Sequence, residues 1–435
     1  MRTRNRDSGA DPALVAGGVV LVDDRLGDAA TGSDGRLRKS TGRQRPADGE
    51  LVGGRLARSR GGWFRPLPMS WARVAVIPCR YRRASSSSSP VETRLMTLTT
   101  PQRPHDILKA VPALATLGRP AVRLHPRQGA PGIEQSSVGG PLLWPTEEPW
   151  PVCRLAHEDT IIEPFAPALK GRYEANRWDW SHGRHGRVDF ATRMRHASEF
   201  ALELVRGANP EFDPDAPVPL IPVAQLYYRD VPDLPWPEKF DLLQILWCPR
   251  DHSGTETDTP HCPAFQVFWR KSETVKGVLT VPPQPDLGLE HYIPNPCVVS
   301  PEVVTEYPNF HTLPDDIKID IDAWEERSSD GTDYSSEFAH APGWKVMGHG
   351  MYWGIYDPYP MTCECGAEQL PLFTADTGEF DGGTKERWQP VEEAHTEWSF
   401  ADPVEVTIGR GYALQLYYCP ESEQHTGRSE NGLNP

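Results

Sequence analysis

Short apolar segments rich in β-branched and aromatic residues recur along the chain from Pro217 onward, separated by turn-forming residues. This pattern is typical of β-strands. The predicted strands are 219–228, 242–248, 265–269, 275–281, 404–408 and 412–419. The chain also contains 45 Pro, which leave little room for long helices. The pattern therefore predicts an α+β, β-rich fold with a few peripheral helices.

Helical spacing of apolar residues occurs in only a few places. Pro112 interrupts the first stretch, and Gly207 is the expected C-terminal cap of the second. The third also alternates like a strand, but Pro314 followed by Asp315 and Asp316 favours a helix start. The predicted helices lie within 107–117, 194–204 and 313–327, and solvated loops are expected at 328–336 and 377–388.

The first 95 residues differ in charge from the rest of the chain. They contain 18 basic and 9 acidic residues, whereas the remainder contains 27 basic and 51 acidic residues. Apolar spacing is sustained only over Ala16–Val22, so this stretch is expected to be disordered. A mis-assigned extension, with translation starting near Met96, would explain the contrast.

The acidity of residues 96–435 bears on the class of partner. Clustered Lys and Arg, which phosphate backbones require, are lacking, so nucleic acid is not expected as a partner. Acidity can steer a basic protein partner, or it can simply keep the chain in solution. No run of about 18 apolar residues occurs, so no membrane association is expected. Eight Cys without a secretory signal indicate reduced thiols or metal ligands, and a cytoplasmic location.

Three short patterns recur in the same order, which indicates an internal duplication. Ser137–Gly140 with Trp144 resembles Lys345–Gly348 with Gly350 and Trp353; residues 223–230 resemble 369–376; and 243–249 with His252 resemble 414–420 with His425. The first copy is expected at about 137–252, a linker at 253–340 and the second copy at about 343–425. Generic buried strands that end in Cys-Pro would give a similar pattern. Two such β-units are expected to pack together, because neither buries its own face alone.

Several of these segments resemble the signature segments of the YwqG-like family, a bacterial domain of unassigned activity. The segments are 137–145, 148–151, 223–226, 242–244, 343–346 and the Cys363–Gly366 turn with Cys419-Pro420. The resemblance covers roughly residues 105–425 and implies a duplicated β-rich architecture. It also implies a distant kinship with eukaryotic chaperones of a ribosomal protein, of the programmed-cell-death-two type, and with immunity proteins encoded beside toxins. It carries over no catalytic residue.

One cysteine set has the chemistry of a zinc site. Cys363, Cys365, Cys419 and His425 offer three thiolates and an imidazole, a set that tetrahedral Zn²⁺ accepts as a structural site. Cys-x-Cys is tighter than the usual Cys-x-x-Cys, so unliganded cysteines in a turn and at a strand end are the alternative.

A second set, Cys248, His252, His261 and Cys262, contains an adjacent His-Cys pair. Neighbours in a strand point to opposite faces, so both members can rarely reach one ion. Buried cysteines acting as small apolar residues are the preferred interpretation.

The leading functional hypothesis is a non-catalytic protein- or peptide-binding module, chaperone-like or immunity-like, that holds its partner between the duplicated halves. Tryptophans in Pro-rich connections suit grooves for extended peptides, although they also suit the stapling of loops onto a sheet. The alternative is a hydrolase with its active site near Gly139, Gly140 and Trp144, although the chain lacks the common local catalytic motifs. The expected partner-binding residues are Gly139, Gly140, Trp144, Trp150, Gln225, Gln244 and Trp353.

Overall fold

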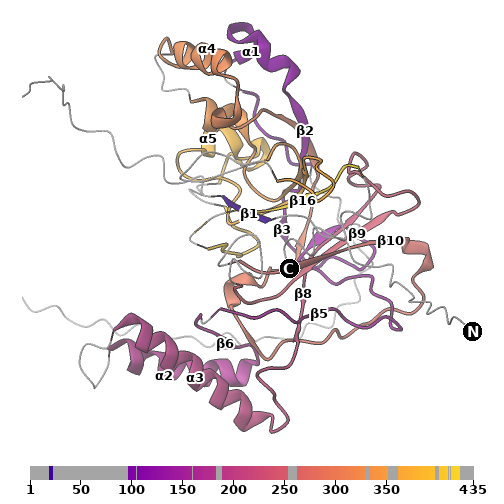
Figure 1. The fold of residues 1–435 in the computed structure, drawn as a ribbon, viewed down its shortest axis with the longest axis vertical. Helices are drawn as coiled ribbons and strands as arrows, with labels where there is room; N and C mark the ends of the chain where they lie inside the picture. Colours follow the sequence, from indigo (N-terminus) through magenta and orange to yellow (C-terminus); the bar gives the residue numbers. More distant parts are fainter. Residues whose placement is uncertain are drawn as a thin grey trace, which may run out of the picture. The chain divides into compact units, whose positions relative to one another are not determined.

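A computed structural model gives the fold of the chain (Figure 1). It describes residues 19–22, 97–103, 105–158, 160–182, 189–252, 262–328, 333–350, 361–396, 401–409, 411 and 413–421. All of them belong to one of the two units into which the chain divides, Met1–Gly27 with Leu95–Pro435. The disorder expected for residues 1–95 lies outside the described residues, except for strand β1 (Val19–Val22).

Two antiparallel sheets form the framework, so the β-rich α+β fold is confirmed. The first sheet has the strand order β10-β9-β8-β4-β12-β3, and the second has the order β1-β16-β15-β14-β2-β13. In the first sheet the strands are β3 (Arg127–Gln128), β4 (Ser137–Val138), β8 (Ile221–Tyr227), β9 (Leu242–Trp247), β10 (Phe265–Arg270) and β12 (Cys297–Val298). In the second they are β1, β2 (Arg119–Arg123), β13 (Glu302–Glu306), β14 (Lys345–Met347), β15 (Leu370–Asp376) and β16 (Ala413–Tyr418).

The two sheets repeat one arrangement of three strands. β4-β8-β9 and β14-β15-β16 have the same order, and all neighbours in them are antiparallel. Each middle strand contains a register shift after a proline, at Pro222/Ala224 in β8 and at Pro371/Phe373 in β15. A β-bulge at the same place in both strands agrees with a duplicated unit.

The register corrects one part of the repeat alignment. Gln225 pairs with Gln244, and Thr374 pairs with Gln415. Since Gln244 and Gln415 are the equivalent residues of the two Leu-Gln segments, Gln225 corresponds to Thr374. The pattern at 223–230 therefore matches residues from 372 onward, three residues later than the side-chain similarity indicates. The proline and the bulge that both strands share set this register.

The duplicated strands do not form separate cores. β2 and β13 precede the second copy in sequence, yet they extend the second sheet beyond β14. One hydrophobic cluster contains buried residues of both sheets, including Val223, Ile245, Trp344 and Leu414. The two copies are therefore parts of one folding unit.

Helices lie outside the two sheets. α2 (Pro167–His182) packs against α3 (Phe190–Ala208), and both contact β6 (Glu163–Pro164), which pairs with β11 (Leu287–Gly288). α1 (Ile107–Ala110) and α4 (Asp315–Glu325) share a separate apolar cluster. The shorter elements are β5 (Val152–Cys153), β7 (Val218–Pro219), α5 (Lys385–Trp388), the π-helical turn Ser335–Ala339, and the 3₁₀ turns Pro112–Thr116, Ser272–Thr274, Glu290–Tyr292, Phe310–Thr312 and Val391–Glu393. Within the described part of the chain, no helix combines the length and apolarity needed to cross a bilayer.

The predicted helices agree with α1, α3 and α4, and Pro112 does break the first one. Gly207 lies inside α3 rather than at its cap, since the helix continues to Ala208. The segments 275–281 and 404–408 are not strands. The loop expected at 377–388 is largely buried and includes α5, because Phe380 and Trp388 pack into an apolar cluster.

Candidate metal centres and an edge-strand groove

Three of the four predicted zinc ligands come together at the end of β16. The sulfur atoms of Cys363, Cys365 and Cys419 all lie within 4.8 Å of one another, and those of Cys365 and Cys419 are 3.7 Å apart. Ligands at about 2.3 Å from a tetrahedral Zn²⁺ are separated by about 3.7 Å, so this spacing fits a metal ion. His425, the fourth predicted ligand, lies outside the described residues.

A tight turn holds the two cysteines of the Cys-x-Cys pair. Cys363 N–H donates to the Ala367 carbonyl at 2.9 Å, and Gly366 N–H donates to the Cys363 carbonyl at 2.8 Å. Gly366 has a φ of +87°, which favours glycine there. The Ala367 N–H lowers the pKa of the exposed Cys365 thiol, whereas burial raises the pKa of Cys419 to about 11. Of these two thiols, Cys365 therefore ionises more readily.

A second cluster lies at the end of β9 and has four donors. Ligand atoms of Cys153, His157, Cys248 and His252 all lie within 4.8 Å of one another. His252 Nε2 is 3.3 Å from the Cys153 sulfur, and His157 Nε2 is 3.3 Å from the Cys248 sulfur. Both cysteines and His252 are buried, and His157 is half-buried. This is the donor set of a closed Cys₂His₂ zinc site.

The surroundings of this cluster favour metal ligation. His252 Nδ1 accepts from the Ala264 N–H at 3.2 Å and lies 3.2 Å from the Cys262 carbonyl oxygen, so backbone contacts hold this edge of the ring and direct Nε2 toward the Cys153 sulfur. A hydrogen bond from Cys248 lowers the pKa of the Cys153 thiol, and burial raises the pKa of Cys248 well above its usual value. Of these two thiols, Cys153 is therefore the one that favours the thiolate form.

Sequence reasoning placed this cluster only in part. The prediction that Cys248 and Cys262 are buried is confirmed. The set of Cys248, His252, His261 and Cys262 is not the one that converges, because Cys153 and His157 supply the other two donors and Cys262 supplies a carbonyl. His261 lies outside the described residues. The available signal was a repeated Cys-x-x-x-His spacing, at 153–157 and 248–252.

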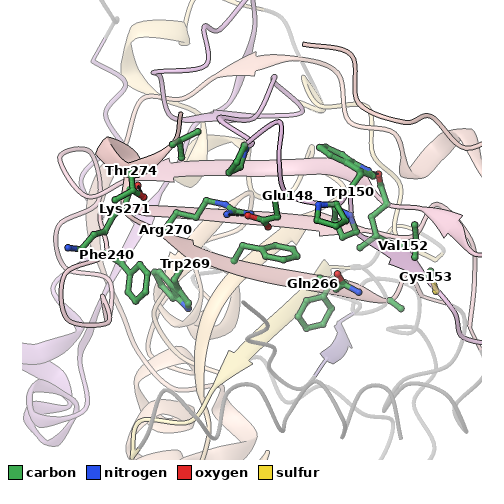
Figure 2. A pocket seen from close by; sticks show the side chains of 18 of the residues that line it. Glu148, Trp150, Val152, Cys153, Phe240, Gln266, Trp269, Arg270, Lys271 and Thr274 are labelled. Atoms are coloured by element: carbon green, nitrogen blue, oxygen red, sulfur yellow. Dashed lines mark hydrogen bonds and ion pairs between the residues drawn. The ribbon is translucent and has the colours of Figure 1, made fainter. Parts of the chain in front are cut away.

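A groove follows the outer side of β10, the end strand of the first sheet (Figure 2). Its volume is about 990 Å³. Aromatic side chains and prolines form much of its wall. Cys153 of the second cluster lies at its margin. The lining includes Pro145, Pro149, Trp150, Pro151, Cys153, Phe240, Phe268 and Trp269. Figure 2 shows Trp150 on one side of Glu148 and Arg270, with Phe240 and Trp269 on the other.

An ion pair occupies the middle of the groove. Both terminal nitrogens of Arg270 donate to the Glu148 carboxylate at 2.5 Å, and Arg270 Nε donates to Gln244 Oε1 at 2.8 Å. Gln244 donates in turn to Gln225 Oε1 at 2.8 Å, and Gln225 Oε1 also accepts from Leu143 N–H at 2.7 Å. The chain of contacts ties the Pro-rich segment after β4 to three neighbouring strands.

The predicted partner-binding residues fall into four groups. Trp150 lines the groove. Trp144, Gln225 and Gln244 are buried beside it, where Trp144 packs on Trp150 and Phe268 and the two glutamines continue the hydrogen-bond chain from Arg270. Gly139 and Gly140 belong to the turn after β4 and do not line the groove. Trp353 lies outside the described residues. The aromatic residues Phe240, Phe268 and Trp269 were missed. Phe268 and Trp269 belong to the predicted strand 265–269 and Phe240 lies just before the predicted strand 242–248, so no motif marked them as groove residues.

The chain matches no protein-family model and no curated protein.

Proposed function

We propose that the protein binds an extended peptide, which lies in the groove along the outer edge of β10. The observation that carries this proposal is the position of the groove on an end strand: among the described residues, no strand pairs with the far side of β10. Unpaired backbone groups of an end strand can pair with an added strand, which gives main-chain affinity without a demand on sequence.

The walls of the groove suit apolar side chains at alternate positions of such a peptide. Trp150 and Trp269 are half-buried, so each keeps an accessible face for contact. Stiff aromatic and proline walls lose little side-chain entropy on binding. Arg270 and Glu148 neutralise each other, so the middle of the groove offers no unpaired charge. We therefore expect an apolar peptide core, with charged residues only near the rim, where Arg154, Glu238, Lys239 and Lys271 lie.

Peptide-library selection followed by titration tests the proposal. A selected peptide should lose affinity at least about tenfold for Trp269→Ala, since buried aromatic anchors carry most binding energy. Val303→Ala is the matched control, because this exposed residue lies on β13 in the other sheet. Methylation of alternate backbone nitrogens of the peptide should abolish binding if a strand is added. Peptides that bind equally to Trp269→Ala, or a library without any binder, would contradict the proposal.

We further propose that the bound peptide belongs to a protein partner for which this chain acts in a chaperone-like or immunity-like way. It is supported by the resemblance to the YwqG-like family and by the duplicated three-strand arrangement. A stoichiometric protein partner recovered from the native host should compete with the selected peptide for the groove. A partner that binds without competing would exclude the groove as its site.

We also propose that the Cys363, Cys365 and Cys419 cluster holds a structural Zn²⁺. Three thiolates are the donors that zinc prefers in closed sites, and the fourth position falls to His425 or to water. Bound zinc would fix the 363–366 turn against the end of β16. Metal analysis of the purified protein should find zinc that Cys363→Ser removes from this site. Retention of the full zinc content in that variant would refute the assignment.

A further inference from the structure

Each of the two Leu-Gln strands, β9 and β16, is followed directly by a cysteine. The strand register makes these two cysteines equivalent. Ile221 of β8 pairs with Trp247, and Leu370 of β15 pairs with Tyr418. Trp247 and Tyr418 thus occupy the same position of the repeat. Cys248 and Cys419 directly follow them, so one ligand of each metal cluster stands at the same place in both copies.

A second equivalence links Cys153 to Cys363. Immediately before β8, Leu220 N–H donates to the Pro151 carbonyl at 3.1 Å, and immediately before β15, Gln369 N–H donates to the Met361 carbonyl at 2.8 Å. The same ladder continues with Val152 opposite Pro219 and with Thr362 opposite Glu368. The next residue in each copy is the cysteine.

The copies differ in what joins the two sides of this ladder. In the second copy the three-residue turn 364–366 closes it and supplies Cys365. In the first copy residues 154–217, which include α2 and α3, occupy the same place. A turn cysteine is therefore replaced by His157 at the start of the insertion, and His252 completes the set after β9.

We infer that the first copy holds a Zn²⁺ ion of its own, bound by Cys153, His157, Cys248 and His252, and that the two metal positions are one site duplicated with the repeat. Two thiolates and two neutral imidazoles balance the charge of Zn²⁺, which suits a buried position. The ion joins the start of the α2–α3 insertion to the end of β9. Since β5 and β7 pair over only two residues, the ion adds to the hydrogen bond from the Glu158 N–H to the Asp251 carbonyl, 2.9 Å long, in holding the insertion at this point.

Metal stoichiometry of the full chain tests the inference. We expect about two zinc ions per chain, one lost in Cys248→Ser and the other in Cys419→Ser. Both variants change the equivalent residue of the repeat, so each is the control of the other. With Co²⁺ in place of zinc, the Cys419→Ser variant should show the absorption of a two-thiolate site. The inference would be overturned if Cys248→Ser kept its full metal content. It would also be overturned if the Co²⁺ spectrum of that variant coincided with that of the unchanged protein.

Hydrogen exchange distinguishes a local effect of the ion on the α2–α3 insertion from a general loss of stability. Cys248→Ser should speed amide exchange in residues 190–208 of α3, whereas Cys419→Ser should leave these amides unchanged. His157→Ala should weaken zinc binding by at least tenfold, and His157→Cys should restore it, which keeps the test decisive where Cys248→Ser fails to fold. Loss of zinc in none of the first-copy variants would exclude this site, whatever the second copy binds.

Discussion

Charged side chains from β3 and from the segments that follow β2 and β15 meet in the interior, where they depend on one another. The Glu379 carboxylate lies 2.8 Å from Arg127 and 3.3 Å from His125, and its side chain is only 2% exposed. Burial alone would raise the pKa of Glu379, but the hydrogen bond from His125 and the positive charge of Arg127 outweigh it and lower the pKa to about 2. Such a carboxylate stabilises the fold only while it is ionised.

Replacement of Glu379 by Gln should change how stability depends on acid pH. A folded-state pKa of about 2 against a reference near 4.5 means that the stabilisation is complete above about pH 5 and is lost as the pH falls toward 2. Glu379→Gln should cost about 3 kcal/mol at pH 7 and almost nothing at pH 2. Denaturant unfolding at several pH values measures this difference. An equal loss at both pH values would show that packing, not charge, holds Glu379.

Two buried histidines serve as the internal control for that measurement. Burial lowers the pKa of His340 to about 3 and that of His349 to about 4. Both are neutral in the fold, so their contribution is present above the unfolded value near 6.5 and declines as the pH falls below it. The decline between pH 6.5 and 4.5 should therefore persist in Glu379→Gln.

Gly139 is a residue whose backbone position excludes any side chain. Its φ is +64°, and a Cβ atom would lie 2.5 Å from the Asn295 carbonyl oxygen. Gly139→Ala should destabilise the protein by about 3 kcal/mol, because the close contact is with backbone. Gly207 in α3 has open space around a Cβ, so Gly207→Ala should stabilise by about 0.5–1 kcal/mol. Urea midpoints compare the two, and an equal tolerance of both changes would contradict the geometry.

The candidate ligands show how far single residues could be predicted. Cys363, Cys365 and Cys419 were recognisable because a Cys-x-Cys turn and a repeated Cys-Pro strand end mark them in the sequence. His157 was not predicted, since it lies at the start of a long insertion and is brought to Cys248 only in the fold, where β5 pairs with β7. The repeated Cys-x-x-x-His spacing marks both residues but does not show that they meet.

At the scale of elements, each copy keeps a polar cross-strand pair inside its sheet. Gln225 and Gln244 form it in the first sheet, and Thr374 and Gln415 form it in the second. Gln415 donates to the Thr374 hydroxyl at 3.1 Å and to the His349 carbonyl at 3.2 Å. Buried polar groups that are satisfied in this way specify the strand register as well as stabilising it.

Gln415→Leu should destabilise the protein by about 2–3 kcal/mol, because the buried hydrogen bonds from Gln415 to the His349 carbonyl and from the Tyr417 hydroxyl to Gln415 are both lost. Thr374→Val should cost about 1 kcal/mol by the same reasoning. A double-mutant cycle measured by urea unfolding should give a coupling of at least about 0.5 kcal/mol. Strict additivity would show that the two side chains do not depend on each other.

The strands at 219–228, 242–248 and 265–269 were predictable because their apolar runs end at clear turn residues. The run 404–408 has the same composition but forms no strand. Val404, Val406 and Ile408 are buried against the main core, while the backbone of Val404 and Thr407 bonds with Asn295 and His291 instead of a neighbouring strand. The composition of 404–408 therefore fits the burial of its apolar side chains, but the prediction of strand hydrogen bonds for this segment was wrong.

For the whole molecule, the sequence indicated two β-units but not how they interlock. Trp247 of the first sheet lies 6.3 Å from Trp344, between ring centroids, next to the second sheet. β2, which lies before both copies in the chain, pairs with β14 of the second copy. Such pairings between distant segments leave no local pattern, so the shared core could not be read from periodicity.

Because both copies contribute to one core, thermal unfolding of the described unit should be a single transition. A cut after residue 336 would leave β2 and β13 in one fragment and β14, which pairs with β2, in the other. We therefore expect the full chain to show one calorimetric transition for this unit, and residues 337–435 expressed alone to remain unfolded. Two resolved transitions, or a folded isolated second copy, would show that each repeat buries enough apolar surface by itself.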